Sequence, residues 1–459
     1  MSETKKRKAH VAMVADTHIG FGEQMTTRLV AVKNTNASST RLHTISGVGS
    51  YGIVFWSALT FLVASRLMLI LSFEVAPSSD AAWYYDRAIE MLATSRYAEG
   101  GVATAYWPVG YPGFLAGLMA LMGQTVRVGQ LANLMLSAAG LVLMYRFCLQ
   151  RFGDSRVAGA AAVLLAVYPN HMGYSVGLFS EPLYTFLLLV TVVFTQPGAG
   201  YGRIALIGVV VGLATLVKAQ MMLLGPILMF FLLLSNWSLG AIGSAFQRAV
   251  LGSLFMAMTI APWTWRNQVV MGAPVPISTN GGMSLLSGNN SSMSTALDHD
   301  YSDRDPIFKS VKFSVADQVA ADKRAKSAAF DWIVDNPGRF IALVPKKAFR
   351  LWVPDGESEW VFQAGYAGYE DHKLWFRSVR VVNQLIYLAL LGGFAFGMAK
   401  CLRPRDPPTL VVPLLLLFFT ALSMVFSGQS RYHSPLMPFV IAYAAWALVR
   451  LWSLKKKLL

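Results

Sequence analysis

Two carboxylates stand out because few other acids surround them in an apolar chain. Asp80 follows the first long apolar run, in Ser78-Ser79-Asp80, and Glu181 opens a later run, in Ser180-Glu181-Pro182. Each is placed to begin a helix, where an acid interacts favourably with the helix dipole and need do no more than that. A carboxylate at the edge of a membrane could instead serve as a general base. The sequence leaves both interpretations open.

Cationic side chains lie near the ends of apolar runs on the same predicted side as these acids. They are Arg66, Lys218, Arg266, Arg431 and His433. Long cations at an interface can act as simple anchors, with the charge reaching into water. Outer loops are as a rule poor in such residues, however, and cations beside carboxylates suit the phosphate group of a lipid. We therefore expect a phosphate-binding site there.

The composition explains why charged residues are informative in this chain. It has 459 residues, of which 55% are hydrophobic and 14% charged, with a mean hydropathy of +0.48. An ordinary soluble domain has about 25% charged residues, so disorder, a coiled coil, collagen and a small disulfide scaffold are excluded. The net charge of +15 fits basic cytoplasmic loops better than nucleic-acid binding. Cys148 and Cys401 predict no structural disulfide.

Apolar runs of about 20 residues predict an all-α polytopic membrane protein. We expect ten transmembrane helices, near 51–72, 128–149, 157–172, 181–196, 203–219, 221–235, 249–265, 380–399, 409–427 and 435–452. Lys and Arg gather in alternate connections, which places both termini in the cytoplasm. The predicted location is a bacterial inner membrane, with the active site facing the periplasm.

Four parts are expected along the chain. They are a disordered basic cytoplasmic tail (1–50), an N-terminal membrane core with the first outer loop and both acids (51–265), a large outer, periplasmic loop (266–379) and the C-terminal membrane helices (380–459). The large loop holds more than half of the 24 acidic residues. The first outer loop, 73–127, should contain interfacial helices at 81–92 and 114–122, and the large loop an amphipathic helix at 317–334 that breaks at 336–338.

Five segments resemble, in order, motifs of a known family. They are Asp80 with Tyr84 and Tyr85; Trp107-Pro108-Val109-Gly110-Tyr111-Pro112; Ser180-Glu181-Pro182-Leu183; Ala261-Pro262-Trp263 and Arg266-Asn267 on to Ser278-Thr279-Asn280-Gly281-Gly282 and Gly288-Asn289-Asn290; and Arg431-Tyr432-His433 with Pro435 and Pro438. The chain thereby resembles the GT-C type integral-membrane glycosyltransferases of family 39, which include protein O-mannosyltransferases and lipid A aminoarabinose transferases. Many relatives have two consecutive acids where this chain has Asp80-Ala81. A lysine that the aminoarabinose transferases carry in the proline-rich motif is absent, which argues against that donor.

The resemblance implies a glycosyltransferase that moves a sugar from a polyprenyl-phosphate carrier to a hydroxyl on the outer side, with inversion. Asp80 would be the base, and Glu181 would orient the acceptor, hold Asp80 or bind a divalent cation. Lys218 and Arg431, with His433, Arg266 and Arg66, would bind the donor phosphate. Tyr84, Tyr85, Trp107, Tyr111 and Tyr432 would line the substrate cavity.

The expected partners are the polyprenyl-phosphate-linked sugar, a lipid, glycan or protein acceptor, and membrane lipid, with no nucleic acid. No cofactor is certain, and a divalent cation stays open. Two other classes of function compete with this one. A surface-polysaccharide polymerase or ligase shares the outer-loop layout. A transporter or flippase for lipid-linked sugars should show symmetry between halves, which the sequence lacks.

Overall fold

A computed structural model describes residues 50–293, 306–353, 355–356 and 358–458. The predicted tail, 1–50, lies outside these residues except for its last position. The chain divides into two units, residues 1–53 and 54–459, and the description below concerns the second. Among the described residues the only strands are β1 (Ala98–Glu99) and β2 (Val102–Ala103), which pair antiparallel with Ala98 opposite Ala103.

Helices make up nearly all of the remaining regular structure. In the first half they are α2 (Ser50–Ser72), α3 (Asp80–Thr94), α4 (Gly110–Met122), α5 (Val126–Phe152), α6 (Ser155–Val167), α7 (Pro169–Gly173), α8 (Glu181–Phe194), α9 (Tyr201–Val217), α10 (Met221–Leu233) and α11 (Leu239–Met271). In the second half they are α12 (Gly281–Gly288), α13 (Pro306–Val311), α14 (Gln318–Asp335), α15 (Pro337–Trp352), α16 (Ser358–Gly365), α17 (Lys373–Cys401), η1 (Pro407–Leu410), α18 (Val411–Val425), η2 (Ser430–Leu436) and α19 (Met437–Leu458).

The predicted fold class is confirmed, and each of the ten expected spans falls on a helix. Six helical segments of the described chain are long and apolar enough to cross a membrane: 52–72, 126–152, 239–271, 373–401, 407–425 and 430–455. The helices α6, α8, α9 and α10 are apolar but shorter, so the number ten is not established. The span expected at 157–172 is broken, because Pro169 forces Tyr168 out of the helical conformation and starts α7.

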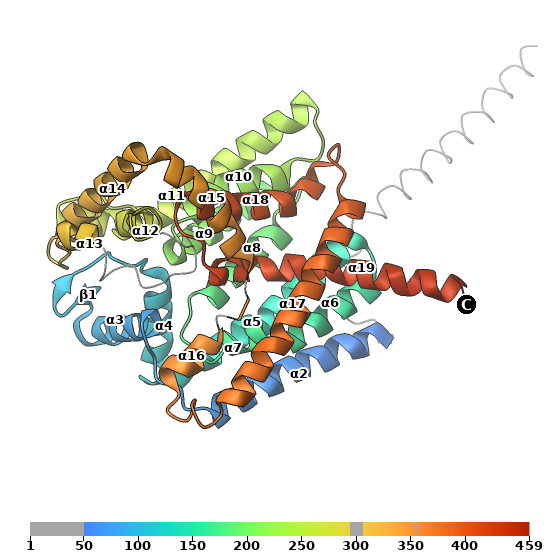
Figure 1. Cartoon of the computed structure of the whole chain (residues 1–459). Helices are drawn as coiled ribbons and strands as arrows, with labels where there is room; N and C mark the ends of the chain where they lie inside the picture. The colour runs from blue at the N-terminus through green and yellow to red at the C-terminus, as the bar shows by residue number, and fades with distance from the viewer. Residues whose placement is uncertain (1–49, 294–305, 354, 357, 459) are drawn as a thin grey trace, which may run out of the picture. The chain divides into compact units, whose positions relative to one another are not determined.

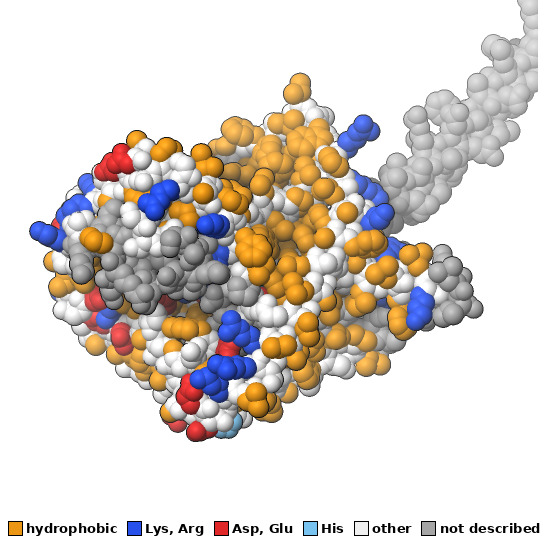
Figure 2. Space-filling view, viewed as in Figure 1, with side chains coloured by type: hydrophobic (Ala, Val, Ile, Leu, Met, Phe, Trp, Pro, Cys, Tyr) orange, Lys and Arg blue, Asp and Glu red, His pale blue; other side chains and the backbone are white. Residues whose placement is uncertain are grey.

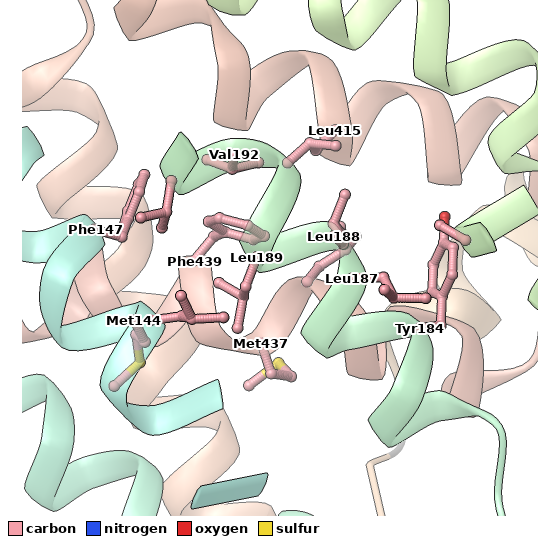
Figure 3. Packing of buried hydrophobic residues seen from close by; sticks show 14 of the residues in the cluster. Met144, Phe147, Tyr184, Leu187, Leu188, Leu189, Val192, Leu415, Met437 and Phe439 are labelled. Atoms are coloured by element: carbon pink, nitrogen blue, oxygen red, sulfur yellow. The ribbon is translucent and has the colours of Figure 1, made fainter. Parts of the chain in front are cut away.

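The core of the membrane unit is built around α8. Figure 3 shows its side chains packed among residues of α5, α18 and α19. The labelled members are Met144, Phe147, Tyr184, Leu187, Leu188, Leu189, Val192, Leu415, Met437 and Phe439, all buried. A helix that is apolar on every side is stable only when other helices surround it. This explains why so short a helix is found at the centre, with Glu181 at its first position.

Large hydrophobic side chains also cover much of the outer surface (Figure 2). On α2 and α17, for example, Trp56, Phe61, Leu385 and Leu388 are all exposed. An apolar surface of this extent would be unstable in water, whereas a bilayer covers it without cost. The chain is therefore an integral membrane protein.

The outer-loop helices follow the sequence predictions closely. The expected helices 81–92, 114–122 and 317–334 are α3, α4 and α14. In Figure 1, α3 lies against α4, and α12 lies against α14. The break expected at 336–338 is confirmed, since Asn336 leaves the helical conformation and Pro337 begins α15. The sequence analysis missed α12, α13, α15 and α16, which are part of the large loop.

Candidate functional site

Four charged residues from four separate elements meet at one place, the charge cluster of Asp80, Glu181, Lys218 and Arg431. Asp80 is the first residue of α3 and Glu181 the first of α8, whereas Lys218 follows the last residue of α9 and Arg431 lies in η2. All four were predicted as site residues. These charged side chains lie at helix ends, where a side chain can extend past the last turn instead of packing against a neighbouring helix.

The cluster consists of two ion pairs. Arg431 Nη1 lies 2.7 Å from Asp80 Oδ2, and Lys218 Nζ lies 2.9 Å from Glu181 Oε1. Arg431 also acts electrostatically on Glu181, which ties the two pairs together. The exposed fractions of the side chains are 19% for Asp80, 23% for Arg431, 21% for Lys218 and 4% for Glu181. Three of the four charges can therefore be reached by a ligand, whereas the Glu181 carboxylate is buried and paired with Lys218.

Asp80 is not the N-cap residue of α3, although its carboxylate lies in the first turn, where the helix dipole favours an acid. Ser79 is the N-cap residue of α3, makes no side-chain capping hydrogen bond, and has the positive φ of 49°. Such a backbone is strained for a residue other than glycine and is often found at functional sites. The contact of the Asp80 carboxylate is the one with Arg431, 351 positions away in the chain.

Aromatic side chains stand beside the charge cluster. Tyr84, one turn after Asp80, is buried, and its ring centroid lies 5.2 Å from that of Tyr111 and 6.3 Å from that of Trp107. Tyr84 feels the charges of Lys218, Asp80 and Glu181, so it faces the cluster. The Arg431 guanidinium lies 5.3 Å from the ring centroid of Tyr432. Of the predicted cavity residues, Tyr84 and Tyr432 thus adjoin the cluster, and Tyr111 and Trp107 pack against Tyr84.

Tyr85 is placed differently from the other predicted cavity residues. Its hydroxyl donates to the Gln124 carbonyl oxygen over 3.2 Å, in an exposed position at the end of α4. Neighbouring residues of a helix point about 100° apart, so Tyr85 points in a different direction from Tyr84.

The proline-rich motif positions Lys218 through Gly110. A Cβ atom added to Gly110 would lie 2.6 Å from the carbonyl carbon and oxygen of Leu216. These are backbone atoms of α9, two residues before Lys218, and they cannot move aside cheaply. The start of α4 therefore fits against the end of α9 only because residue 110 has no side chain.

The substitution Gly110→Ala should push α4 away from the end of α9. Overpacking of this kind costs about 1–3 kcal/mol. We expect a lower midpoint of thermal unfolding and weaker binding of an anionic ligand at Lys218. The matched control is Gly117→Ala in the same helix, where an added Cβ meets nothing within 4 Å. Equal thermal stability of the two variants would contradict the role given to Gly110.

Three predicted phosphate ligands have other partners. Arg66 is fully buried, and its guanidinium donates to the carbonyl oxygens of Leu62, Leu165 and Ala166, and lies 3.5 Å from His171.

Arg266 holds the first outer loop. Its guanidinium donates to the carbonyl oxygens of Thr104 and Tyr97 and lies 4.9 Å from the ring centroid of Trp263. His433 uses both ring nitrogens, toward the Leu351 carbonyl oxygen and Asp355. The structure thus brings Lys218 and Arg431 to the acids and places Arg66, Arg266 and His433 in other contacts.

A buried polar network around Asp355 was missed by the sequence analysis. The Asp355 side chain is 1% exposed and accepts hydrogen bonds from Tyr168, Asn170 and Asn383, with His433 alongside. Burial by itself raises the pKa of a carboxyl group, but the donors outweigh it and hold the pKa of Asp355 below its usual value. Nothing local in the sequence around Asp355 marks it, because every partner side chain comes from a distant segment.

A cavity of about 680 Å³ lies away from the charge cluster. Its walls come from α2, α7, α16 and α17, and they include Phe61, Met68, Phe362 and Trp375. None of the four cluster residues lines it. Within the described residues no group of three or more His, Cys, Asp or Glu side chains forms a candidate metal site.

Part of the chain matches a known protein family. Residues 107–265 match the family described as dolichyl-phosphate-mannose-protein mannosyltransferase. This segment contains the proline-rich motif, Glu181 and Lys218. The chain shows no significant match to any curated protein sequence.

Solved structures to which the chain is similar include an archaeal oligosaccharyltransferase and a bacterial ArnT. The oligosaccharyltransferase of Archaeoglobus fulgidus superposes with a TM-score of 0.54 at 13% identity, over 90% of this chain and 52% of that one. Its complex with zinc and sulfate gives 0.52 at 15% identity, over 87% and 49%. ArnT from Cupriavidus metallidurans gives 0.40 at 14% identity, over 86% and 76%. The chain spans about half the length of the archaeal protein, and at 13–15% identity the likeness to that protein concerns the fold alone.

Proposed function

We propose that this chain transfers a sugar from a polyprenyl-phosphate carrier to a hydroxyl acceptor, because it resembles the GT-C membrane glycosyltransferases in the sequence of residues 107–265 and in its fold. The resemblance inferred from the sequence motifs is confirmed. The observation that supports the reaction most directly is the charge cluster, in which two cations and two acids from four elements meet beside aromatic side chains.

The leaving group needs the cations. A sugar linked to a lipid phosphate is a phosphodiester with a single negative charge, and cleavage of the bond to the sugar leaves a phosphomonoester that gains a second one. Fixed cations stabilise this developing charge more than the charge of the ground state, which lowers the barrier. Lys218 and Arg431 are the reachable cations of the cluster. We assign the phosphate to them.

Binding of the phosphate would rearrange the ion pairs. In the structure Arg431 is held by Asp80 and Lys218 by Glu181, so a phosphate must compete with the carboxylates for both cations. When Arg431 turns to the phosphate, an oxygen of Asp80 is released to accept a proton. Binding of the donor would thus free the Asp80 carboxylate to act as a base. Without a donor, the charge of Asp80 stays neutralised by Arg431.

Asp80 is the better candidate for the base. It accepts the proton of the acceptor hydroxyl, whose oxygen forms the new bond to the anomeric carbon as the bond from that carbon to the phosphate oxygen breaks. This is a single displacement and inverts the anomeric centre. The Asp80 side chain is 19% exposed against 4% for Glu181. Glu181 then orients Lys218, which favours a supporting role over direct contact with the acceptor.

The proposed orientation places the charge cluster outside. We also propose that the protein lies in a bacterial inner membrane with both termini in the cytoplasm. The four parts of the chain are those expected from the sequence, 1–50, 51–265, 266–379 and 380–459. Cysteine labelling should reach positions near 290 and 430 from outside, and positions near 155, 403 and 455 from inside. Labelling of 306–353 only from the cytoplasm would reverse the orientation and with it the side on which transfer occurs.

The direct test is a transfer assay. Purified protein is incubated with radiolabelled polyprenyl-phosphate sugars and a membrane extract, and the label is followed into lipid, glycan and protein fractions. We expect the label to move into one of these fractions, which identifies the acceptor class, and we expect polyprenyl phosphate to be released at the same time. Label that stays on the carrier with every sugar, while Asp80→Asn and the unaltered protein behave alike, would contradict the proposal.

A further inference from the structure

His433 makes two hydrogen bonds that fix its state. It lies in η2 two residues after Arg431 and is fully buried. Its Nδ1 is 2.6 Å from the Leu351 carbonyl oxygen, and its Nε2 is 3.2 Å from Asp355 Oδ1. A carbonyl oxygen only accepts hydrogen bonds, so Nδ1 carries a hydrogen. The state of Nε2 depends on whether Asp355 accepts or donates.

The surroundings of Asp355 answer that question. Asn383 Oδ1 accepts from the backbone N–H of Asn170, and Asn170 Oδ1 accepts from the backbone N–H of Ser358. These contacts orient both amides so that their NH₂ groups face Asp355, and the Tyr168 hydroxyl donates there as well. A carboxyl surrounded by donors is ionised and accepts only. Nε2 of His433 therefore carries a hydrogen too.

The ring environment suits a cation. The imidazole is stacked between Trp352 and Tyr387, with ring centroids 5.7 and 5.2 Å away and planes inclined by 9° and 17°. The face of an aromatic ring attracts a positive charge. The other titratable groups facing Asp355 are Tyr168 at the start of α7, His171 within α7 and Tyr387 from α17.

We infer that His433 is an imidazolium that forms a buried ion pair with Asp355, and that this pair is a positioning device for Arg431. The inference rests on the proposed function, since it assigns Arg431 to the donor phosphate. Because η2 is a tight helix of seven residues, fixing residue 433 also fixes the backbone of residue 431. The pair joins η2 to the segment after α15 and, through Asn383, to α17.

The opposite side of this turn is held separately. Lys347 Nζ donates to Asn289 Oδ1 over 2.8 Å, and Asn289 Nδ2 donates to the Val425 carbonyl oxygen at the end of α18. The chain between Val425 and His433 is thus anchored at both ends. Loss of the His433 anchor should loosen the backbone that carries Arg431 while α18 stays in place, although the Arg431 side chain keeps its contacts with Asp80 and Gln429.

The charge state is tested by nitrogen NMR on protein with labelled histidine. The ring of His433 should give the signals of two protonated nitrogens at pH 7.5, and its proximity to the rings of Trp352 and Tyr387 assigns them. Asp355→Asn should turn this ring neutral. A neutral ring in the unaltered protein would overturn the inference. Because that measurement needs no variant, it holds even if Asp355→Asn does not fold.

The positioning role is tested by binding of polyprenyl phosphate itself. We expect Asp355→Asn to weaken its binding about tenfold, part of what full loss of a charge-assisted contact costs. The control is Glu359→Gln, which removes a nearby acid whose partners are Arg380 and Tyr369 and should leave binding unchanged. Unchanged affinity in folded Asp355→Asn would overturn the positioning role. If the unaltered protein bound no polyprenyl phosphate, the proposed function would fail, whereas the NMR result would still decide the ion pair.

Discussion

Asp80→Asn should reduce sugar transfer by a factor of about 10² to 10⁴, the usual contribution of a general base. The amide keeps the size of the side chain and its hydrogen bond from Arg431, but it cannot take up a proton. Donor binding should be retained or become tighter, because the phosphate no longer competes with a carboxylate for Arg431. The measurement is turnover and donor affinity in the same preparation, with thermal unfolding to check the fold.

The controls for this prediction come from the same helix and from the second acid. Asp86→Asn changes an exposed acid of α3 and should leave transfer unaffected. Glu181→Gln should weaken the hold on Lys218 and act mainly on donor binding. If Glu181→Gln abolished turnover and Asp80→Asn did not, the roles of the two acids would have to be exchanged. Transfer at the normal rate in Asp80→Asn would remove the base from the mechanism.

The helices were predictable because hydropathy and turn residues are local signals. A run of apolar residues that ends near Gly153 defines a helix without knowledge of its neighbours, whereas the span expected at 157–172 ran past the equally local signal of Pro169. The lengths of the short helices explain why the number of spans was harder to predict. Helices such as α8 are apolar on every side and lie within the core, where they need not match the thickness of a bilayer.

The pairing within the site could not be predicted in the same way. Lys218 and Glu181 are 37 positions apart, and Asp80 and Arg431 are 351 apart. The sequence indicated that each of these four residues lies at the outer end of a span. Many side chains lie at that depth, so depth alone does not determine which of them are in contact. Arg66 and His433 satisfied the same criterion, but their partners are helix-end carbonyls and a buried acid. The family motifs set Asp80 and Arg431 apart from Arg66, but they include His433 together with Arg431, so only the structure distinguishes those two.

Lys218→Met and Arg431→Met should each weaken donor affinity by about 10- to 100-fold, since a charge-assisted contact in a partly buried site contributes about 1.5–3 kcal/mol. The control is Arg380→Met, which removes an arginine whose ion-pair partner is Glu359 and which lies outside the cluster. Arg380→Met should bind the donor normally. Normal donor affinity in both Lys218→Met and Arg431→Met would mean that the phosphate binds elsewhere.

The two cations should differ in their effect on stability. Lys218→Met leaves the Glu181 carboxylate, 4% exposed, without its partner, and breaking a buried ion pair costs about 3–5 kcal/mol. Arg431→Met leaves Asp80, which water still reaches, so unfolding should shift less. Adding Glu181→Gln to Lys218→Met neutralises both partners and should restore stability without restoring donor affinity. Recovery of both together would show that Lys218 acts on the donor only through the fold of its surroundings.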